Sequence, residues 1–157
     1  MKSEPDVYSI DDLARDKKTY WDGVRNYQAR NFMRDQMKTG DKVFFYHSNG
    51  EPPGIAGVAE IVRQGYPDPS ACDPKDIHYD SKSSSEKSVW YVVDIRFVKK
   101  FSRLIPLEEL RKVKALEKMP LLARGQRLSV QPVGEKEWEI ICGLVKDKKA
   151  PSQVSIS

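Results

Sequence analysis

The segment from Val89 to Val98 has the most regular strand pattern in the chain, and it calls for a fold that contains a sheet. Its apolar side chains fall at every second position, so a β-strand would place them on one face. These side chains are Val89, Tyr91, Val93, Ile95 and Phe97. Two more apolar runs, Val43–Tyr46 and Ile55–Arg63, predict further strands, and the first suits a strand buried on both faces.

Short helices are expected between the strands. Capping residues and apolar side chains at helical spacing predict them at Ser9–Leu13, Asn26–Met37, Pro106–Leu110 and Glu135–Val145. Short strands are also predicted at Met1–Ser3 and Arg127–Pro132. Because the helices are short and the strands include hairpin-like neighbours, we expect an α+β fold in which peripheral helices surround a curled sheet or partial barrel.

The composition is that of a soluble globular domain. Of the 157 residues, 32% are charged and 39% hydrophobic, and the net charge of +4 favours a polyanionic partner only mildly. No apolar run approaches the ~20 residues of a membrane span, and the N-terminus has no signal-peptide pattern. We expect one domain (residues 1–146) with a short tail (147–157) in an intracellular protein, cytoplasmic in a bacterium or nuclear in a eukaryote.

Aromatic, arginine and asparagine side chains are concentrated around a glycine in the stretch Trp21–Phe32. Aromatic faces beside amide and guanidinium donors suit a flat ligand with polar edges, such as a nucleobase. A structural interpretation competes with this one: Trp21 would belong to the core, Asn26 would cap a helix, and both arginines would form a solvated face. Arg30 lies one helical turn beyond Asn26, so both can point toward a ligand above the helix N-terminus.

The polar segment Gln64–Lys87 is long for a loop in a compact domain, which is typical of a functional or mobile element. Its residues Tyr66, His78 and Tyr79 are candidates to fold over a binding site. Trp90 follows this segment directly. It is either a second wall for a flat ligand or part of a satellite core.

Common catalytic and cofactor signatures are absent from the sequence. It has no P-loop, no GxGxxG, no GxSxG and no deaminase motif. Cys72 and Cys142 form no CxxC pair, and together with His47 and His78 they show no metal-ligand spacing. The sequence therefore favours binding over catalysis, and we expect no cofactor and no metal.

Several motifs together resemble the EVE domain family over nearly the whole chain, to about Val145. They are Lys2–Pro5, Trp21–Phe32, Phe44–Ser48, Pro53–Gly57, Tyr66–Asp68 and Arg127–Pro132. The resemblance implies a PUA-like fold, in which short helices flank a mixed, barrel-like sheet. Family members usually carry a few more residues before the motif at Lys2, so we expect a shortened first strand here.

The resemblance also implies a function, the binding of a flipped or unpaired modified base, chiefly modified cytosine in DNA, in an aromatic-walled pocket. Related pockets use the residues that correspond to Ser3 and Trp21. The other candidate ligand-binding residues are Asn26, Tyr27, Arg30, Tyr46, His47, Ser48, Trp90 and Gln131. Trp21 would stack on the base, Ser3, Asn26 and Gln131 would bond its edge, and Arg25, Arg30 or Arg34 would hold phosphates.

Two other functions remain open. One is an RNA-binding PUA-like module without preference for a modification. The other is an amidohydrolase acting on modified cytidine through Lys2 and Glu4, as in related PUA-like folds. We expect a monomer that binds nucleic acid, DNA rather than RNA, and no membrane.

Overall fold

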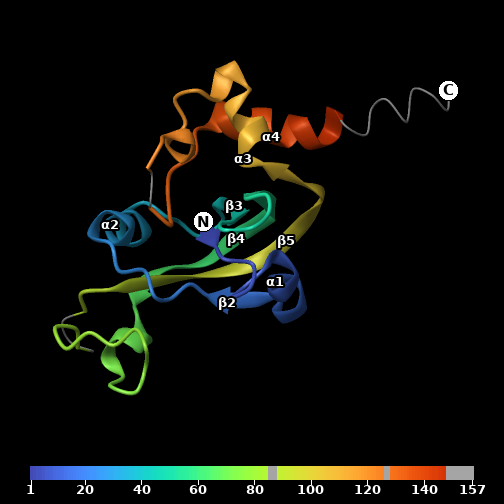
Figure 1. Cartoon of the computed structure of the whole chain (residues 1–157). Coiled ribbons are helices and arrows are strands. Elements are labelled where there is room, and N and C mark those ends of the chain that lie inside the picture. Colours follow the sequence, from blue (N-terminus) through green and yellow to red (C-terminus); the bar gives the residue numbers. More distant parts are fainter. Residues whose placement is uncertain (85–87, 126–127, 148–157) are drawn as a thin grey trace.

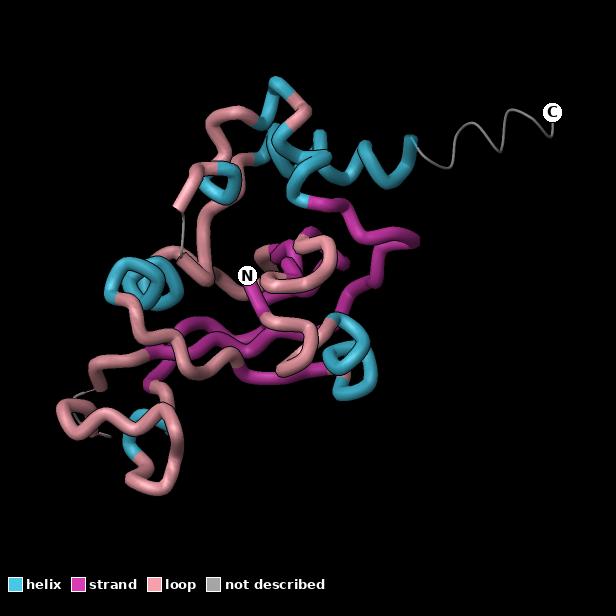
Figure 2. The backbone as a smooth tube through the Cα atoms, viewed as in Figure 1, coloured by secondary structure: helices cyan, strands magenta, loops and turns pink. Residues whose placement is uncertain are grey.

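The computed structural model of the protein describes residues 1–84, 88–125 and 128–147. Within these residues, five strands form one sheet in the order β1-β3-β4-β5-β2. The strands are β1 (Lys2–Ser3), β2 (Lys18–Tyr20), β3 (Lys42–His47), β4 (Gly54–Pro67) and β5 (Tyr91–Pro106). β1 runs parallel to β3, and the other neighbours are antiparallel. The long strand β5 sweeps around the molecule, so the sheet curls (Figures 1 and 2). The α+β prediction is confirmed.

Short helices surround the sheet. They are α1 (Ile10–Asp16), α2 (Tyr27–Asp35), α3 (Leu107–Arg111) and α4 (Glu135–Asp147), with 3₁₀ turns at Pro69–Cys72, Lys114–Leu116 and Pro120–Leu122. Ser9 caps α1 in a capping box: its hydroxyl accepts from the Asp12 N–H at 3.1 Å, and the Asp12 carboxylate accepts from the Ser9 N–H at 2.8 Å. Asn26 caps α2 by accepting from the Ala29 N–H at 3.0 Å. Both predicted helix starts are confirmed.

Strand boundaries differ from the prediction where pairing across the sheet decides them. β4 continues to Pro67, because Tyr66 and Pro67 pair with Val92 and Tyr91 of β5, so the loop between these strands is shorter than expected. β1 has only two residues, as expected for a shortened first strand, and it still pairs with β3.

The strand predicted at Arg127–Pro132 is wrong for its described part, residues 128–132; Arg127 lies outside the described residues. The side-chain amide of Gln131 turns back to donate to the Leu128 carbonyl at 2.8 Å. This bond closes a local turn, as polar side chains near the backbone often do. One backbone bond, from the Lys2 N–H to the Ser129 carbonyl (2.8 Å), ties the turn to the edge of the sheet.

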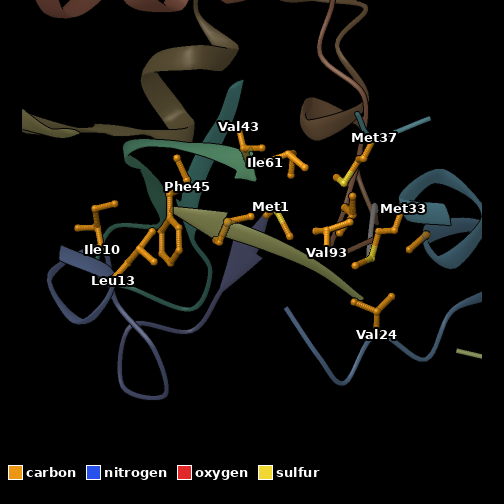
Figure 3. Packing of buried hydrophobic residues seen from close by; sticks show 14 of the residues in the cluster. Met1, Ile10, Leu13, Val24, Met33, Met37, Val43, Phe45, Ile61 and Val93 are labelled. Atoms are coloured by element: carbon orange, nitrogen blue, oxygen red, sulfur yellow. The ribbon is translucent and has the colours of Figure 1, made fainter. Parts of the chain in front are cut away.

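Two hydrophobic clusters cover the two faces of the sheet. The first joins α1 and α2 to the sheet through Leu13, Met33 and Phe45 (Figure 3). The second lies under α3 and α4, where Trp138 stacks on Phe44 with ring centroids 3.8 Å apart. Phe44 and Phe45 are neighbours on β3, and successive strand residues point to opposite faces. The predictions that β3 is buried on both faces and that Trp138 belongs to the core are confirmed.

Candidate functional site

A pocket of about 340 Å³ opens beside β1 and β2. Its walls are formed by Lys2, Ser3, Val7, Tyr8, Thr19–Arg25, His78 and Ser129. Its volume lies in the range of about 300–1,000 Å³ that small-molecule sites span. The pocket therefore brings together the two residues for which the family resemblance is most specific, Ser3 and Trp21, although eighteen positions separate them.

Trp21 belongs to both the pocket and the core. Its ring meets Phe45 edge to face at a centroid distance of 5.6 Å and Tyr8 at 6.5 Å, and its backbone N–H donates to the Val93 carbonyl at 2.8 Å. Such edge-to-face contacts orient the indole firmly. The side chain is only partly buried, so it both packs on the core and lines the pocket.

Ser3 presents an acceptor at the pocket. Its hydroxyl donates to the Tyr8 carbonyl at 2.6 Å, and this bond occupies its one proton. A hydroxyl has two acceptor lone pairs besides its donor. Ser3 therefore keeps the capacity to accept a hydrogen bond in the wall of the pocket.

The pocket also contains a carboxylate that the sequence analysis did not select, that of Asp22. Burial raises the pKa of Asp22 above its ordinary value. The His78 ring, whose Nδ1 atom lies 3.8 Å from the Asp22 carboxylate, lowers this pKa and so offsets part of the increase. His78 faces the backbone of Gly23, where φ is +76° and a Cβ would lie 2.6 Å from the His78 Nε2 atom. Only glycine fits there without strain. The position of Asp22 directly after Trp21 was the signal that could have indicated it.

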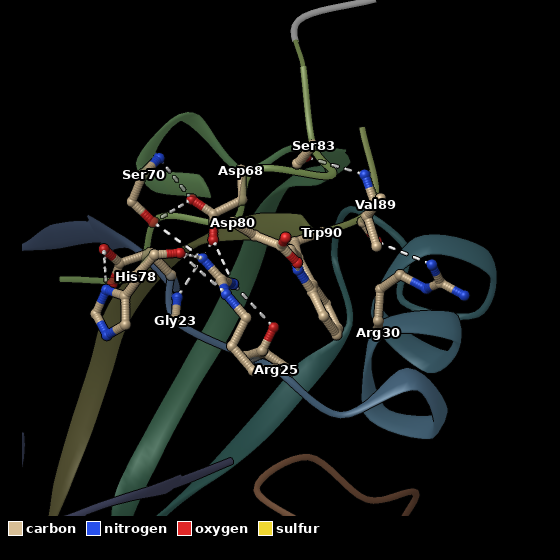
Figure 4. Close-up of polar contacts among 12 residues, drawn as sticks. Gly23, Arg25, Arg30, Asp68, Ser70, His78, Asp80, Ser83, Val89 and Trp90 are labelled. Atoms are coloured by element: carbon tan, nitrogen blue, oxygen red, sulfur yellow. Dashed lines mark hydrogen bonds and ion pairs between the residues drawn. The ribbon is translucent and has the colours of Figure 1, made fainter. Parts of the chain in front are cut away.

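Arg25 holds the loop that carries His78 against the Trp21–Arg25 segment (Figure 4). Its guanidinium pairs with Asp68 at 3.0 Å and donates to the His78 carbonyl at 2.6 Å. The Asp68 carboxylate is fully buried. It also accepts two hydrogen bonds from Ser70, one from the Ser70 N–H (2.8 Å) and one from the Ser70 hydroxyl (2.6 Å). Burial pushes the pKa of Asp68 up, but the bonds from Ser70 and Arg25 outweigh it, so the pKa is lowered. Arg25 therefore positions the site.

Trp90 lies under this arginine and does not line the pocket of Trp21. It is buried, its indole N–H donates to the Asp80 carboxylate at 2.6 Å, and the Arg25 guanidinium lies 5.2 Å from its ring centroid. Tyr27 stacks on Trp90 with ring centroids 5.0 Å apart. The Arg30 guanidinium lies over the Tyr27 ring and donates to the Val89 carbonyl at 2.9 Å. These three predicted residues form one cluster beside the pocket.

Comparison with known proteins adds an independent observation. The family model described as "EVE domain" matches residues 1–144. The chain belongs to the EVE domain family. Human thymocyte nuclear protein 1 is 44% identical over 97% of this chain and 74% of its own length. The family prediction made from the motifs is confirmed.

Two solved structures show how similar the fold of this EVE domain is to that of its relatives. A protein from Pseudomonas syringae is 50% identical, with a TM-score of 0.88 over 92% of this chain and 97% of that one. The human THYN1 protein is 43% identical, with a TM-score of 0.85 over 92% of this chain and 95% of that one. The latter was solved in complex with 5-methylcytosine-containing DNA.

The remaining predicted residues of the EVE domain lie outside the pocket. Tyr46 and Ser48 line an adjacent hollow of about 680 Å³ that shares Lys2 and Ser129 with the pocket. Gln131 lines a hollow of about 580 Å³ and also, with Tyr46, Lys2 and Ser129, a small cavity of about 30 Å³. Asn26 is exposed and occupied as a helix cap. Of the ten candidates, only Ser3 and Trp21 share the pocket, and the ligand-binding role of all ten stays a prediction.

Two further properties concern the described residues only. None of their helices is long and apolar enough to cross a membrane. They contain no cluster of three or more His, Cys, Asp or Glu side chains placed to hold a metal ion.

His47 makes a structural contact, and this contact predicts a pH dependence of stability. Its Nε2 atom accepts from the Ile10 N–H at 3.0 Å, and burial lowers the pKa of the ring. The unfolded chain, with a pKa near ~6.5, then binds the proton more readily, so stability falls as the pH drops below that value. In His47→Gln an amide oxygen can accept the same bond without titrating. In urea unfolding at several values between about pH 7.5 and about pH 5, wild type should lose stability relative to this variant. If the free energy of unfolding changed with pH in the same way for wild type and His47→Gln, the effect would not come from His47.

Proposed function

We propose that this EVE domain binds modified cytosine in DNA and holds the base in the pocket of Ser3, Trp21 and Asp22. The observation that carries the proposal is the human THYN1 structure, which has 43% identity and a TM-score of 0.85 and was solved with 5-methylcytosine-containing DNA. The pocket suits this ligand chemically, because its lining joins an indole ring to two polar groups. The base would be flipped out of the duplex or unpaired, since a stacked base cannot enter a pocket.

Asp22 supplies the feature that favours cytosine. A carboxylate accepts a hydrogen bond from the exocyclic amino group of cytosine, whereas thymine and uracil present a carbonyl oxygen at that position. Asp22 is partly buried, so it loses some of its water before the base arrives. A ligand amino group that restores a partner to this carboxylate is therefore favoured, and a carbonyl oxygen is rejected.

The phosphate contacts would come from arginines other than Arg25, whose donors are engaged within the protein. Arg34 lies on the surface and pairs there with Asp35 at 2.8 Å. Exposed pairs of this kind are weak, so a phosphate can replace the carboxylate. Phosphate contacts should weaken as salt rises, whereas base discrimination should remain.

The experiment is a binding titration with matched oligonucleotides that differ at one base: cytosine, 5-methylcytosine, 5-hydroxymethylcytosine, thymine, adenine or N6-methyladenine. We expect a modified cytosine to bind most tightly. Asp22→Asn should weaken that binding about tenfold and reduce discrimination against thymine, since a good base contact contributes ~1–3 kcal/mol. Glu117→Gln removes one exposed negative charge elsewhere and serves as the matched control.

Equal binding to all six strands, fading with salt, would overturn the proposal and favour the module without modification preference. The expectation that the chain is not an enzyme stays a prediction. Lys2 and Glu4 both line the hollow beside the pocket, and Glu4 accepts there from the Asn49 amide at 3.0 Å. The hydrolase alternative predicts that the protein forms a product from a modified cytidine and that Lys2→Ala or Glu4→Ala abolishes this product formation.

A further inference from the structure

Several exposed apolar side chains either line the pocket or adjoin one of its lining residues in the chain. Among the described residues, five large apolar side chains are exposed: Val7, Tyr20, Tyr27, Ile77 and Tyr79. Val7 and Tyr20 line the pocket, and Ile77 and Tyr79 are the chain neighbours of His78, which also lines it. Ile77 is the extreme case, with 92% of its surface exposed. Such a side chain adds nothing to the core, and an apolar patch at a binding site indicates contact with a partner.

The loop presents Ile77 on a firmly held backbone. The residue before it, Asp76, accepts from the His78 N–H at 2.8 Å and from the Tyr79 N–H through its carbonyl at 3.1 Å. The residue after it, His78, has its carbonyl held by Arg25 at 2.6 Å (Figure 4). The described part of the loop extends beyond the ends of β4 and β5 (Figure 1). Ile77 thus stands on a braced turn, one residue before His78 of the pocket wall.

We propose that Ile77 is a wedge that enters the DNA base stack where the flipped base has left a gap. This inference rests on the proposed function. Removing a base from the stack costs roughly a few kcal/mol. Proteins that distort DNA often insert an apolar side chain between the base pairs at the opened step. Val7 and Tyr20 line the pocket itself and so would meet the flipped base, whereas Ile77 does not line the pocket but is the chain neighbour of His78, which does.

The loop around Ile77 carries charges of both signs. The loop carboxylates of Asp73, Asp76 and Asp80 each accept from a backbone N–H of their own turn. Lys75 and Lys82 are exposed on the same loop. Because these hydrogen bonds leave the carboxylates charged, phosphates that flank an inserted Ile77 would have to be contacted by Lys75 and Lys82.

The test compares Ile77→Ser with Ile77→Met on two DNAs. In the first, 5-methylcytosine pairs with guanine inside a duplex; in the second, the same base faces an abasic site and needs no unpairing. We expect Ile77→Ser to bind the paired duplex about tenfold or more weakly than wild type and the abasic duplex about equally well. Ile77→Met, which keeps an apolar side chain of similar length, should bind both like wild type. Because the side chain is so exposed, thermal unfolding should not change.

Each other outcome has a distinct meaning. If Ile77→Ser binds the paired duplex like wild type, the proposed wedge role of Ile77 is overturned, but the proposed function is not affected. The exposed apolar side chains would then be explained by a protein partner. An equal loss on both DNAs also overturns the wedge, because Ile77 would then contact the base or its neighbours directly. If wild type prefers 5-methylcytosine over cytosine in neither DNA, the proposed function fails, and the wedge fails with it.

Discussion

Replacing Arg25 by alanine should lower the free energy of unfolding by about 3–5 kcal/mol, the usual result of removing one partner of a buried ion pair. The Asp68 carboxylate has no exposed surface, and the Arg25 side chain is only 25% exposed. Without the guanidinium, Asp68 would remain buried with hydrogen bonds from Ser70 and Gly23 but with no positive charge against it. The loss is a large part of the ~5–15 kcal/mol by which domains are stable.

Urea unfolding followed by circular dichroism measures this loss at neutral pH, and Arg34→Ala provides the control. Arg34 pairs with Asp35 on the surface, so its removal should change stability by less than about 1 kcal/mol. Because the folded pKa of Asp68 is lowered, its contribution is present above the unfolded pKa of ~3.9 and disappears as the pH falls through the folded pKa. Wild type and Arg25→Ala should therefore converge in acid. If Arg25→Ala and Arg34→Ala lowered the free energy of unfolding equally, the role given to Arg25 would be refuted.

Replacing Trp21 by alanine should have two effects at once. Stability should fall by about 2–3 kcal/mol, less than the ~3–5 kcal/mol of a fully buried tryptophan, because the ring packs on Phe45 and Tyr8 but remains partly open to the pocket. Affinity for the modified strand should fall roughly 10- to 100-fold, since stacking of one base on an aromatic ring is worth ~1–3 kcal/mol.

Trp21→Phe separates these two effects. A phenyl ring can keep much of the edge contact with Phe45 but offers a smaller face to a base. We expect it to recover most of the stability and only part of the affinity. Anisotropy of labelled DNA is the suitable measurement, because the variants change the protein's own fluorescence. If Trp21→Ala loses stability while folded protein binds the modified strand with unchanged affinity, Trp21 is a core residue and the stacking role fails.

Local features of the fold were predictable because their physical causes lie within a few residues. Ser9 and Asn26 cap helices by bonding to backbone groups three positions ahead, so the pattern is visible in the sequence. Phe44 and Phe45 point to opposite faces because a strand alternates. The predicted strand at residues 128–132 failed because its apolar alternation is short and the Gln131 side chain provides a competing turn.

The contents of the site depended on contacts between distant parts of the chain. The sequence by itself determined the family and the α+β class, since these follow from motifs and local periodicity, and the family resemblance offered Ser3 and Trp21 as candidate ligand-binding residues. Only the tertiary structure decided that Arg25 turns inward to Asp68 and His78, that Trp90 lies beneath it, and that Asp22 enters the pocket. The pairing of β4 with β5 brings the loop back over Trp21–Arg25. Which partner a charged side chain finds is set by that pairing, and neither spacing nor composition encodes it.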